Sequence, residues 1–263
     1  MIIYERKIKY LLISLGLILL LNFIAKIIGQ NIFSVESFIY KIITKSLLAL
    51  LVVGFIIKYN VLKNVVISKR IVTDLVIALL LVFFSYYTTL DNITEDGQTV
   101  SSTRHILYLL SCITVACMEE FLFRVYVFGF LLQYGKERNY KNPVPLALIL
   151  SSLIFGVAHI FNVFRDDIEI YSVINQVILA FGLGMLFQSL LIRFKSILIP
   201  IVIHSIINYL GMYKRYLYEE SFFEAEQYNF SDFFISLLTI LVIILFVITP
   251  ISYSLIRKQI RAK

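Results

Sequence analysis

The chain has 263 residues, of which 60% are hydrophobic and only 16% are charged, and its formal net charge is +7. A soluble domain of this size does not bury so much apolar surface, so the composition predicts a polytopic membrane protein. Most lysines and arginines flank hydrophobic segments, as charges that set membrane topology do. This placement argues against a nucleic-acid-binding protein.

The hydrophobic segments predict an all-α membrane bundle of about eight transmembrane helices. They cover roughly 10–28, 40–59, 71–90, 106–134, 146–161, 173–193, 196–213 and 233–256. No small-residue cleavage site follows the first segment, so it is expected to be a retained helix. No proline- or serine-rich linker and no repeat interrupts the chain, so residues 1–263 are predicted to form a single integral membrane domain. The segment 146–161 is short for a span, which predicts a strongly buried or partly re-entrant helix.

The charges of the connecting loops alternate along the chain. The N-terminal segment, the even-numbered loops and the C-terminal tail are basic, whereas the other loops are acidic or neutral. Because lysine and arginine are enriched in cytoplasmic loops, both termini are predicted to face the cytoplasm.

Several polar residues in or near the spans have ordinary explanations. Lys41 and Lys45 are close to a span end, where their ammonium groups can reach the membrane surface. His105 falls in a predicted external loop and is expected to be solvated. Cys112 and Cys117 are five residues apart and point to different faces of a helix, which predicts packing residues and no mutual disulfide.

The segment 106–134 carries three ionisable residues at membrane depth, in the order Glu119, Glu120 and Arg124. An ionised side chain at mid-bilayer costs at least about 2.5–3.5 kcal/mol on insertion scales, so the group predicts a functional site. Glu120 and Arg124 are four residues apart and share a helix face, so they are predicted to form an ion pair. Glu119 is rotated about 100° away from that face. A carboxylate without a salt bridge in a low-dielectric site suits a general acid or base, so Glu119 is predicted to be reactive and Glu120 structural.

Two later spans carry aligned polar pairs. Phe155 and His159 are four residues apart in one, and His204 and Asn208 are four residues apart in the other. The imidazole and the carboxamide of the second pair could both donate hydrogen bonds to one oxygen and so form an oxyanion hole. Alternatively, the imidazole could ligate a metal while the amide forms a hydrogen bond in the second coordination shell. For each histidine alone, a buried imidazole bonded to a backbone carbonyl is the ordinary alternative. Polar groups on separate helices of one bundle favour a shared site.

In this order the patterns Glu-Glu-x-x-x-Arg, Phe-x-x-x-His and His-x-x-x-Asn resemble the motifs of the CAAX protease and bacteriocin-processing (CPBP) family of intramembrane endopeptidases, also called the Abi family. The glycine-containing stretch 181–184 and the turn 193–196 before His204 also look like that family. The resemblance covers about residues 106–210, which would be the catalytic core.

The resemblance implies peptide-bond hydrolysis in or beside the membrane. By this resemblance, Glu119 and His159 would be catalytic residues that activate a water. His204 and Asn208 would be catalytic residues that stabilise the oxyanion. Glu120, Arg124 and Phe155 would support the site. The family has been described both as metalloproteases and as glutamate proteases. A zinc site would use His159, His204 and Glu119. The histidines do not form the His-Glu-x-x-His pair of zincins, so the favoured expectation is that no metal or other cofactor takes part.

The sequence therefore predicts an intramembrane endopeptidase that contacts membrane lipid and cleaves a membrane-associated peptide or protein, either a bacteriocin, a pheromone or a CAAX-like substrate. Bacteriocin self-immunity is one role that follows. A composition rich in Ile, Phe, Tyr, Lys and Asn favours an AT-rich genome and a bacterial cell membrane. One alternative is a non-proteolytic protein that retains the protease fold and regulates a sensor kinase. The loss of a motif residue would favour this alternative, but no motif residue is lost. Another is a transporter with a proton site at the glutamates, but the chain lacks the related halves usual in transporters.

Overall fold

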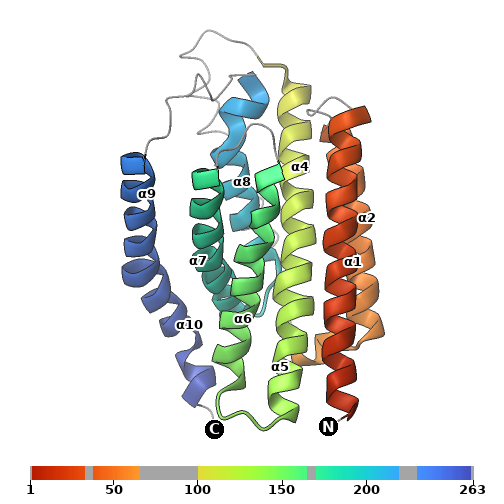
Figure 1. Cartoon of the computed structure of the whole chain (residues 1–263), viewed down its shortest axis with the longest axis vertical. Helices are drawn as coiled ribbons and strands as arrows, with labels where there is room; N and C mark the ends of the chain where they lie inside the picture. The colour runs from red at the N-terminus through yellow and green to blue at the C-terminus, as the bar shows by residue number, and fades with distance from the viewer. Residues whose placement is uncertain (1, 33–37, 66–99, 165–169, 219–229, 262–263) are drawn as a thin grey trace.

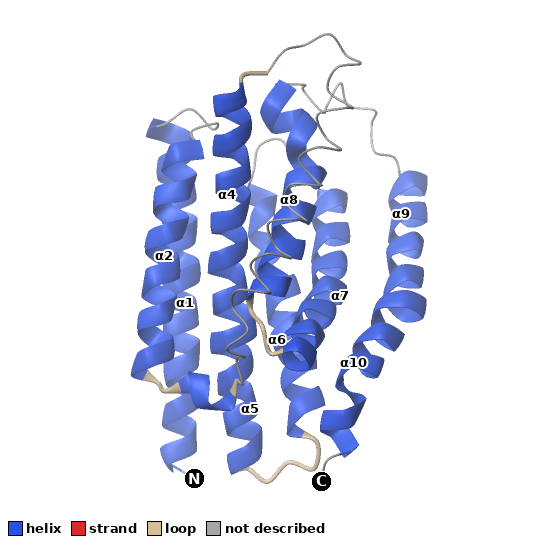
Figure 2. Ribbon diagram, turned by 180° about the vertical axis from the view of Figure 1, so that it is seen from behind, coloured by secondary structure: helices blue, strands red, loops and turns tan. Residues whose placement is uncertain are grey.

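The computed structural model of the chain describes residues 2–32, 38–65, 100–164, 170–218 and 230–261. These residues form helices and a few short turns, and they contain no β-strand (Figures 1 and 2). The predicted all-α membrane bundle is therefore confirmed.

The helices follow one another as α1 (Ile2–Ile32), α2 (Phe38–Lys58), a 3₁₀ turn η1 (Val61–Asn64), α4 (Ser102–Glu120), a π-helical segment η2 (Phe121–Val127), α5 (Phe128–Glu137), α6 (Pro143–Ala158), a 3₁₀ turn η3 (His159–Phe164), α7 (Ile170–Phe194), α8 (Leu198–Tyr218), α9 (Phe230–Ile243), a second π segment η4 (Ile244–Ile248) and α10 (Thr249–Arg261).

Most predicted spans coincide with these helices. Within the described residues, 6 helices are long and apolar enough to cross a membrane, and Leu198–Gly211 of α8 is a shorter apolar helix. The chain is thus a multi-pass integral membrane protein. The predicted span 71–90 lies outside the described residues.

Two predicted boundaries need correction. The span predicted at 146–161 is not short: it runs from Pro143 to Phe164, and its 22 residues suffice to cross. Its helix starts earlier because prolines at the first helical positions fit the helical φ, and η3 extends it beyond Ala158. The span predicted at 106–134 is part of a continuous run of 36 residues, Ser102–Glu137. At 1.5 Å per residue this run is about 54 Å long, more than the roughly 30 Å hydrocarbon core.

The start of α1 and the end of α10 lie at the same end of the bundle, as an even number of crossings requires (Figures 1 and 2). The C-terminal end of α2 and the turn between α5 and α6 lie there too, so the basic residues Lys58, Lys136 and Arg257 share that end. This grouping is what the loop-charge pattern predicts. That this end faces the cytoplasm stays a prediction.

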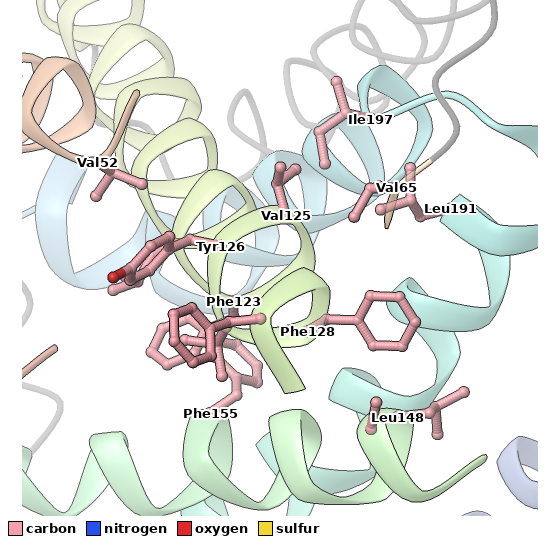
Figure 3. Packing of buried hydrophobic residues seen from close by; sticks show 14 of the residues in the cluster. Val52, Val65, Phe123, Val125, Tyr126, Phe128, Leu148, Phe155, Leu191 and Ile197 are labelled. Carbon is pink, nitrogen blue, oxygen red and sulfur yellow. The ribbon is translucent and has the colours of Figure 1, made fainter. Parts of the chain in front are cut away.

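The continuous helix α4–η2–α5 occupies the middle of the bundle. It packs against α2, α8 and α6, and every residue from Leu122 to Phe130 is buried. A helix at the edge of a bundle would bury only one stripe of its surface. Figure 3 shows this central segment, with Phe123 beside Phe155 of α6. The polar residues that precede it are therefore held inside protein.

Helices α6 and α7 approach closely at two glycines. A Cβ on Gly156 would lie 2.8 Å from the Val177 carbonyl oxygen of α7, and one on Gly184 would lie 3.0 Å from Ser152 Cβ and 3.3 Å from the Phe155 ring. Any larger residue would push the helices apart. The glycines thus set Phe155, and the start of η3 after it, directly against α7.

Candidate active site

The centre of the site is a buried ion pair on α4 and η2. Arg124 Nε lies 2.9 Å from Glu120 Oε2, Arg124 Nη2 lies 3.4 Å from Glu120 Oε1, and both side chains are fully buried. The predicted pairing is therefore present. The Arg124 guanidinium also lies over two aromatic rings, 4.3 Å from the centroid of Phe155 and 5.6 Å from that of Phe187. Such cation–π contacts add to the stabilisation of a desolvated cation.

Glu120 has a second partner that the sequence did not indicate. Its Oε1 lies 2.9 Å from Nδ1 of His204 on α8. Because an ionised carboxylate only accepts hydrogen bonds, Nδ1 carries the proton and donates it. The imidazole also stacks on Phe187, with centroids 5.3 Å apart, and meets the Phe155 ring edge-on at 6.0 Å. The orientation of His204 is thus set by one carboxylate and two aromatic rings.

Glu119 lies on the other side of the same imidazole. Its Oε2 is 3.6 Å from His204 Nε2, and its side chain is 19% exposed whereas that of Glu120 is fully buried. Arg124 pairs with Glu120, and the group that α8 brings to Glu119 is an imidazole. The two neighbouring glutamates differ in burial and bind opposite sides of one ring.

The backbone changes to a π-helix immediately after this pair. Segment η2 begins at Phe121, whose N–H bonds to the carbonyls of both Cys117 and Met118. Short π segments within α-helices often occur at functional sites. The 3.6-residue periodicity of the sequence contains no signal for this change.

His159 lies at the junction of α6 and η3. Its Nδ1 is 2.9 Å from the Phe155 carbonyl oxygen, and its ring meets the Phe155 ring edge-on at 4.8 Å. A carbonyl only accepts, so Nδ1 donates and Nε2 of the neutral ring is left as an acceptor. No hydrogen bond or ion pair joins His159 to either glutamate within the described part of the chain. Phe155 is the residue that contacts both imidazoles.

Asn208 lies one helical turn after His204 and is held through its backbone. The Tyr108 hydroxyl of α4 donates to the carbonyls of Asn208, at 3.0 Å, and Tyr209, at 2.9 Å. The rings of Tyr108 and Tyr209 lie 5.0 Å apart, and His105 Nδ1 lies 3.3 Å from the Tyr209 hydroxyl. These contacts fix α8 against α4, and the sequence analysis did not identify either tyrosine.

The same contacts correct one prediction. His105 is not a solvated loop residue, because it is only 2% exposed. Helix α4 already begins at Ser102, so the residue lies on a helix face that packs against α8. Cys112 and Cys117 are both free in the structure, and Cys112 is buried.

The candidate zinc ligands do not fit a metal site in this arrangement. Within the described residues, no group of three or more His, Cys, Asp or Glu side chains could hold a metal ion. In the set His159, His204 and Glu119, each histidine bonds through Nδ1, His159 to a backbone carbonyl and His204 to Glu120, which leaves Nε2 as the nitrogen that could ligate a metal. Only Nε2 of His204 faces Glu119.

A polytopic helical bundle with a buried Glu–Arg–His group and a second, partly exposed glutamate at its centre has the form of an intramembrane enzyme. Residues 101–210 match the family described as "Type II CAAX prenyl endopeptidase Rce1-like". This segment contains every motif residue from Glu119 to Asn208, and its match agrees with the predicted resemblance to the CPBP family of membrane endopeptidases. No curated protein and no solved structure matches the chain.

Proposed function

We propose that the protein is a glutamate-type intramembrane endopeptidase that cleaves a membrane-associated peptide or protein without a metal ion. The match of residues 101–210 to a CAAX endopeptidase family supports peptide-bond hydrolysis in general. The observation that carries the finer proposal is the position of His204, with Nδ1 2.9 Å from Glu120 and Nε2 3.6 Å from Glu119. An oriented imidazole beside a partly exposed carboxylate is a combination suited to acid–base catalysis.

In this mechanism Glu119 is the general base. It takes a proton from a water that also bonds to Nε2 of His159, and the resulting hydroxide attacks the carbonyl carbon of the scissile peptide bond. The C–N bond then breaks as Glu119 returns the proton to the leaving amine. Glu119 suits this role because its side chain is partly exposed, whereas that of Glu120 is fully buried.

His204 and Asn208 are the proposed oxyanion donors. His204 Nδ1 bonds to Glu120, and Nε2 is the nitrogen we propose as the donor to the oxyanion. The carboxylates of Glu120 and Glu119 lie on the two sides of this ring. A donor directed at the tetrahedral oxyanion stabilises the transition state more than the substrate, which is the requirement for catalysis.

Glu120, Arg124 and Phe155 act by holding these groups. Arg124 neutralises Glu120, and Glu120 orients His204. Phe155 contacts Arg124 and both imidazoles. A metal is not needed for this chemistry, and Asn208 supports that choice because a neutral amide is a hydrogen-bond donor and not a usual zinc ligand.

The substrate we propose is a peptide held at the membrane, in the cell membrane of a bacterium. The family's description makes a prenylated CAAX peptide one candidate. A bacteriocin and a peptide pheromone are the other candidate substrates, and cleavage of a bacteriocin would give self-immunity.

The test is cleavage by the purified full-length protein in proteoliposomes. Farnesylated CAAX peptides and unprenylated hydrophobic leader peptides are incubated with wild type and with Glu119→Gln, and products are identified by mass spectrometry. We expect wild type to cleave one class and Glu119→Gln to cleave neither. Equal product from both proteins would refute the assignment of Glu119. No cleavage by wild type, together with stable binding of a sensor kinase, would favour the non-proteolytic regulator.

A further inference from the structure

Helices α4 and α8 pack against each other (Figures 1 and 2) and are joined by hydrogen bonds at two levels. At one level the Glu120 carboxylate of α4 bonds to the His204 imidazole, at 2.9 Å. At the other, the Tyr108 hydroxyl of α4 donates to two successive carbonyls of α8, those of Asn208 at 3.0 Å and Tyr209 at 2.9 Å. Each of the two proposed oxyanion donors, His204 and Asn208, therefore has an anchor on α4.

The two anchors hold different parts of the two donors. The His204 side chain is held directly, by a carboxylate and two aromatic rings. The Asn208 side chain is half-buried, and its carboxamide forms no hydrogen bond to another described residue. Donors of an oxyanion hole must be in place before the charge develops. For Asn208 this placement comes from the backbone of α8, and the backbone is what Tyr108 binds.

Tyr108 holds that backbone from a rigid setting. Its side chain is only 1% exposed, and its ring centroid lies 5.6 Å from that of Phe38 on α2 and 5.0 Å from that of Tyr209. Each carbonyl oxygen has two lone pairs, so it can accept the tyrosine bond beside a helical one. Because the hydroxyl bonds to two successive carbonyls, a rotation or a slide of α8 would lengthen at least one contact.

We propose that Tyr108 is a positioning residue that fixes the α8 backbone so that the Asn208 carboxamide points at the oxyanion. The proposal rests on the proposed function of Asn208 as an oxyanion donor. Tyr108 acts through Asn208 and does not touch the reacting atoms. A misplacement of about 1 Å in an active site can cost up to about 10²-fold in rate, so a loosened anchor has a measurable effect.

Tyr209 provides a matched control at the same helix contact. It is as deeply buried as Tyr108, and its hydroxyl lies 3.3 Å from Nδ1 of His105 on α4. Tyr108→Phe and Tyr209→Phe each remove one buried hydroxyl and keep both rings. Only the first removes a bond to the backbone at Asn208. A general effect of losing a tyrosine hydroxyl between α4 and α8 would appear in both variants.

The first experiment measures steady-state cleavage in proteoliposomes by wild type and these two variants. We expect Tyr108→Phe to lower kcat by about tenfold, within the range for a misplaced group. KM should change little, because the oxyanion exists only in the transition state and the intermediate. Tyr209→Phe should match wild type.

A double-mutant cycle separates positioning from a merely structural role. Asn208→Ala should lower kcat by about 10²–10³-fold, as loss of an oxyanion donor does. Adding Tyr108→Phe to Asn208→Ala should then have little further effect, because the group that Tyr108 positions is gone. A structural role would give the same further loss in both backgrounds.

NMR of protein labelled with ¹⁵N-asparagine, in detergent micelles, provides a readout that needs no cleavage. The side-chain amide signal of Asn208, assigned by its absence from the Asn208→Ala spectrum, should move further in Tyr108→Phe than in Tyr209→Phe.

Four results would overturn the proposal: wild-type kcat in Tyr108→Phe, an equal loss in Tyr209→Phe, an additive double variant, or an amide signal that Tyr108→Phe leaves in place. A loss confined to KM would overturn it in favour of a contact between Tyr108 and substrate. If wild type cleaves nothing, the proposed function fails, and the amide signal still decides whether Tyr108 positions Asn208.

Discussion

His204 and Glu120 are joined by a 2.9 Å hydrogen bond between helices α8 and α4, and the same carboxylate pairs with Arg124. One fully buried glutamate therefore neutralises a cation on its own helix and orients an imidazole on another. Glu119, the preceding residue, faces the opposite nitrogen of that imidazole at 3.6 Å. This division makes the two adjacent glutamates unequal in ways that can be measured.

Glu119→Gln is expected to abolish turnover while the protein stays folded. The substitution removes the base but keeps the shape of the side chain, and a general base typically contributes about 10²–10⁴-fold. Cleavage of the identified substrate and the folded fraction by size-exclusion chromatography are the measurements. A variant that turns over at the wild-type rate would refute the catalytic role.

Glu120→Gln is expected to lower stability as well as activity. It leaves the buried Arg124 cation without its counter-charge, and removal of one partner of a buried ion pair costs about 3–5 kcal/mol. His204 would also lose its charged acceptor. The free energy of unfolding in detergent should fall well below that of Glu119→Gln, the matched control. Equal unfolding free energies for the two variants would contradict this prediction.

Gly156→Ala is expected to destabilise the contact between α6 and α7. The new Cβ would lie 2.8 Å from a backbone oxygen, that of Val177, so the helices must separate. Overpacking of this kind costs about 1–3 kcal/mol, and it would displace Phe155 and His159 from α7. Thermal unfolding and cleavage are both measured.

The matched control is Gly54→Ala on α2, where an added Cβ meets nothing within 4 Å. Alanine is favoured over glycine in a helix by about 0.5–1 kcal/mol, so this variant should be as stable as wild type or more so. The prediction fails if Gly156→Ala is tolerated equally well.

Activity is expected to survive exhaustive chelation. Within the described residues, no three His, Cys, Asp or Glu side chains form a group that could hold a metal ion, and of the two candidate histidines it is His204 whose Nε2 faces Glu119. Cleavage is compared before and after treatment with a strong zinc chelator, alongside elemental analysis of the purified protein. Stoichiometric zinc, with activity lost on stripping and restored on re-addition, would show that the enzyme is a metalloprotease.

The sequence by itself determined the features that depend on local geometry and composition. Apolar runs of span length predict helices wherever they occur, because every backbone polar group must be satisfied within the membrane. The Glu120–Arg124 pair followed from four-residue spacing, since helical side chains at that separation share a face. The spacing of the motif residues also predicted the segment that matches the endopeptidase family, residues 101–210.

Only the tertiary structure decided which groups from different helices meet. The bond between Glu120 and His204 joins residues 84 positions apart, and the burial of His105 and the anchoring of Lys45 by Asn22 depend on neighbouring helices. Hydrophobic periodicity predicts which residues of a helix are buried. Every residue from Leu122 to Phe130 is buried, so in this segment the periodicity does not specify the partner of each face. Helix packing sets those partners, and with them the different surroundings of Glu119 and Glu120.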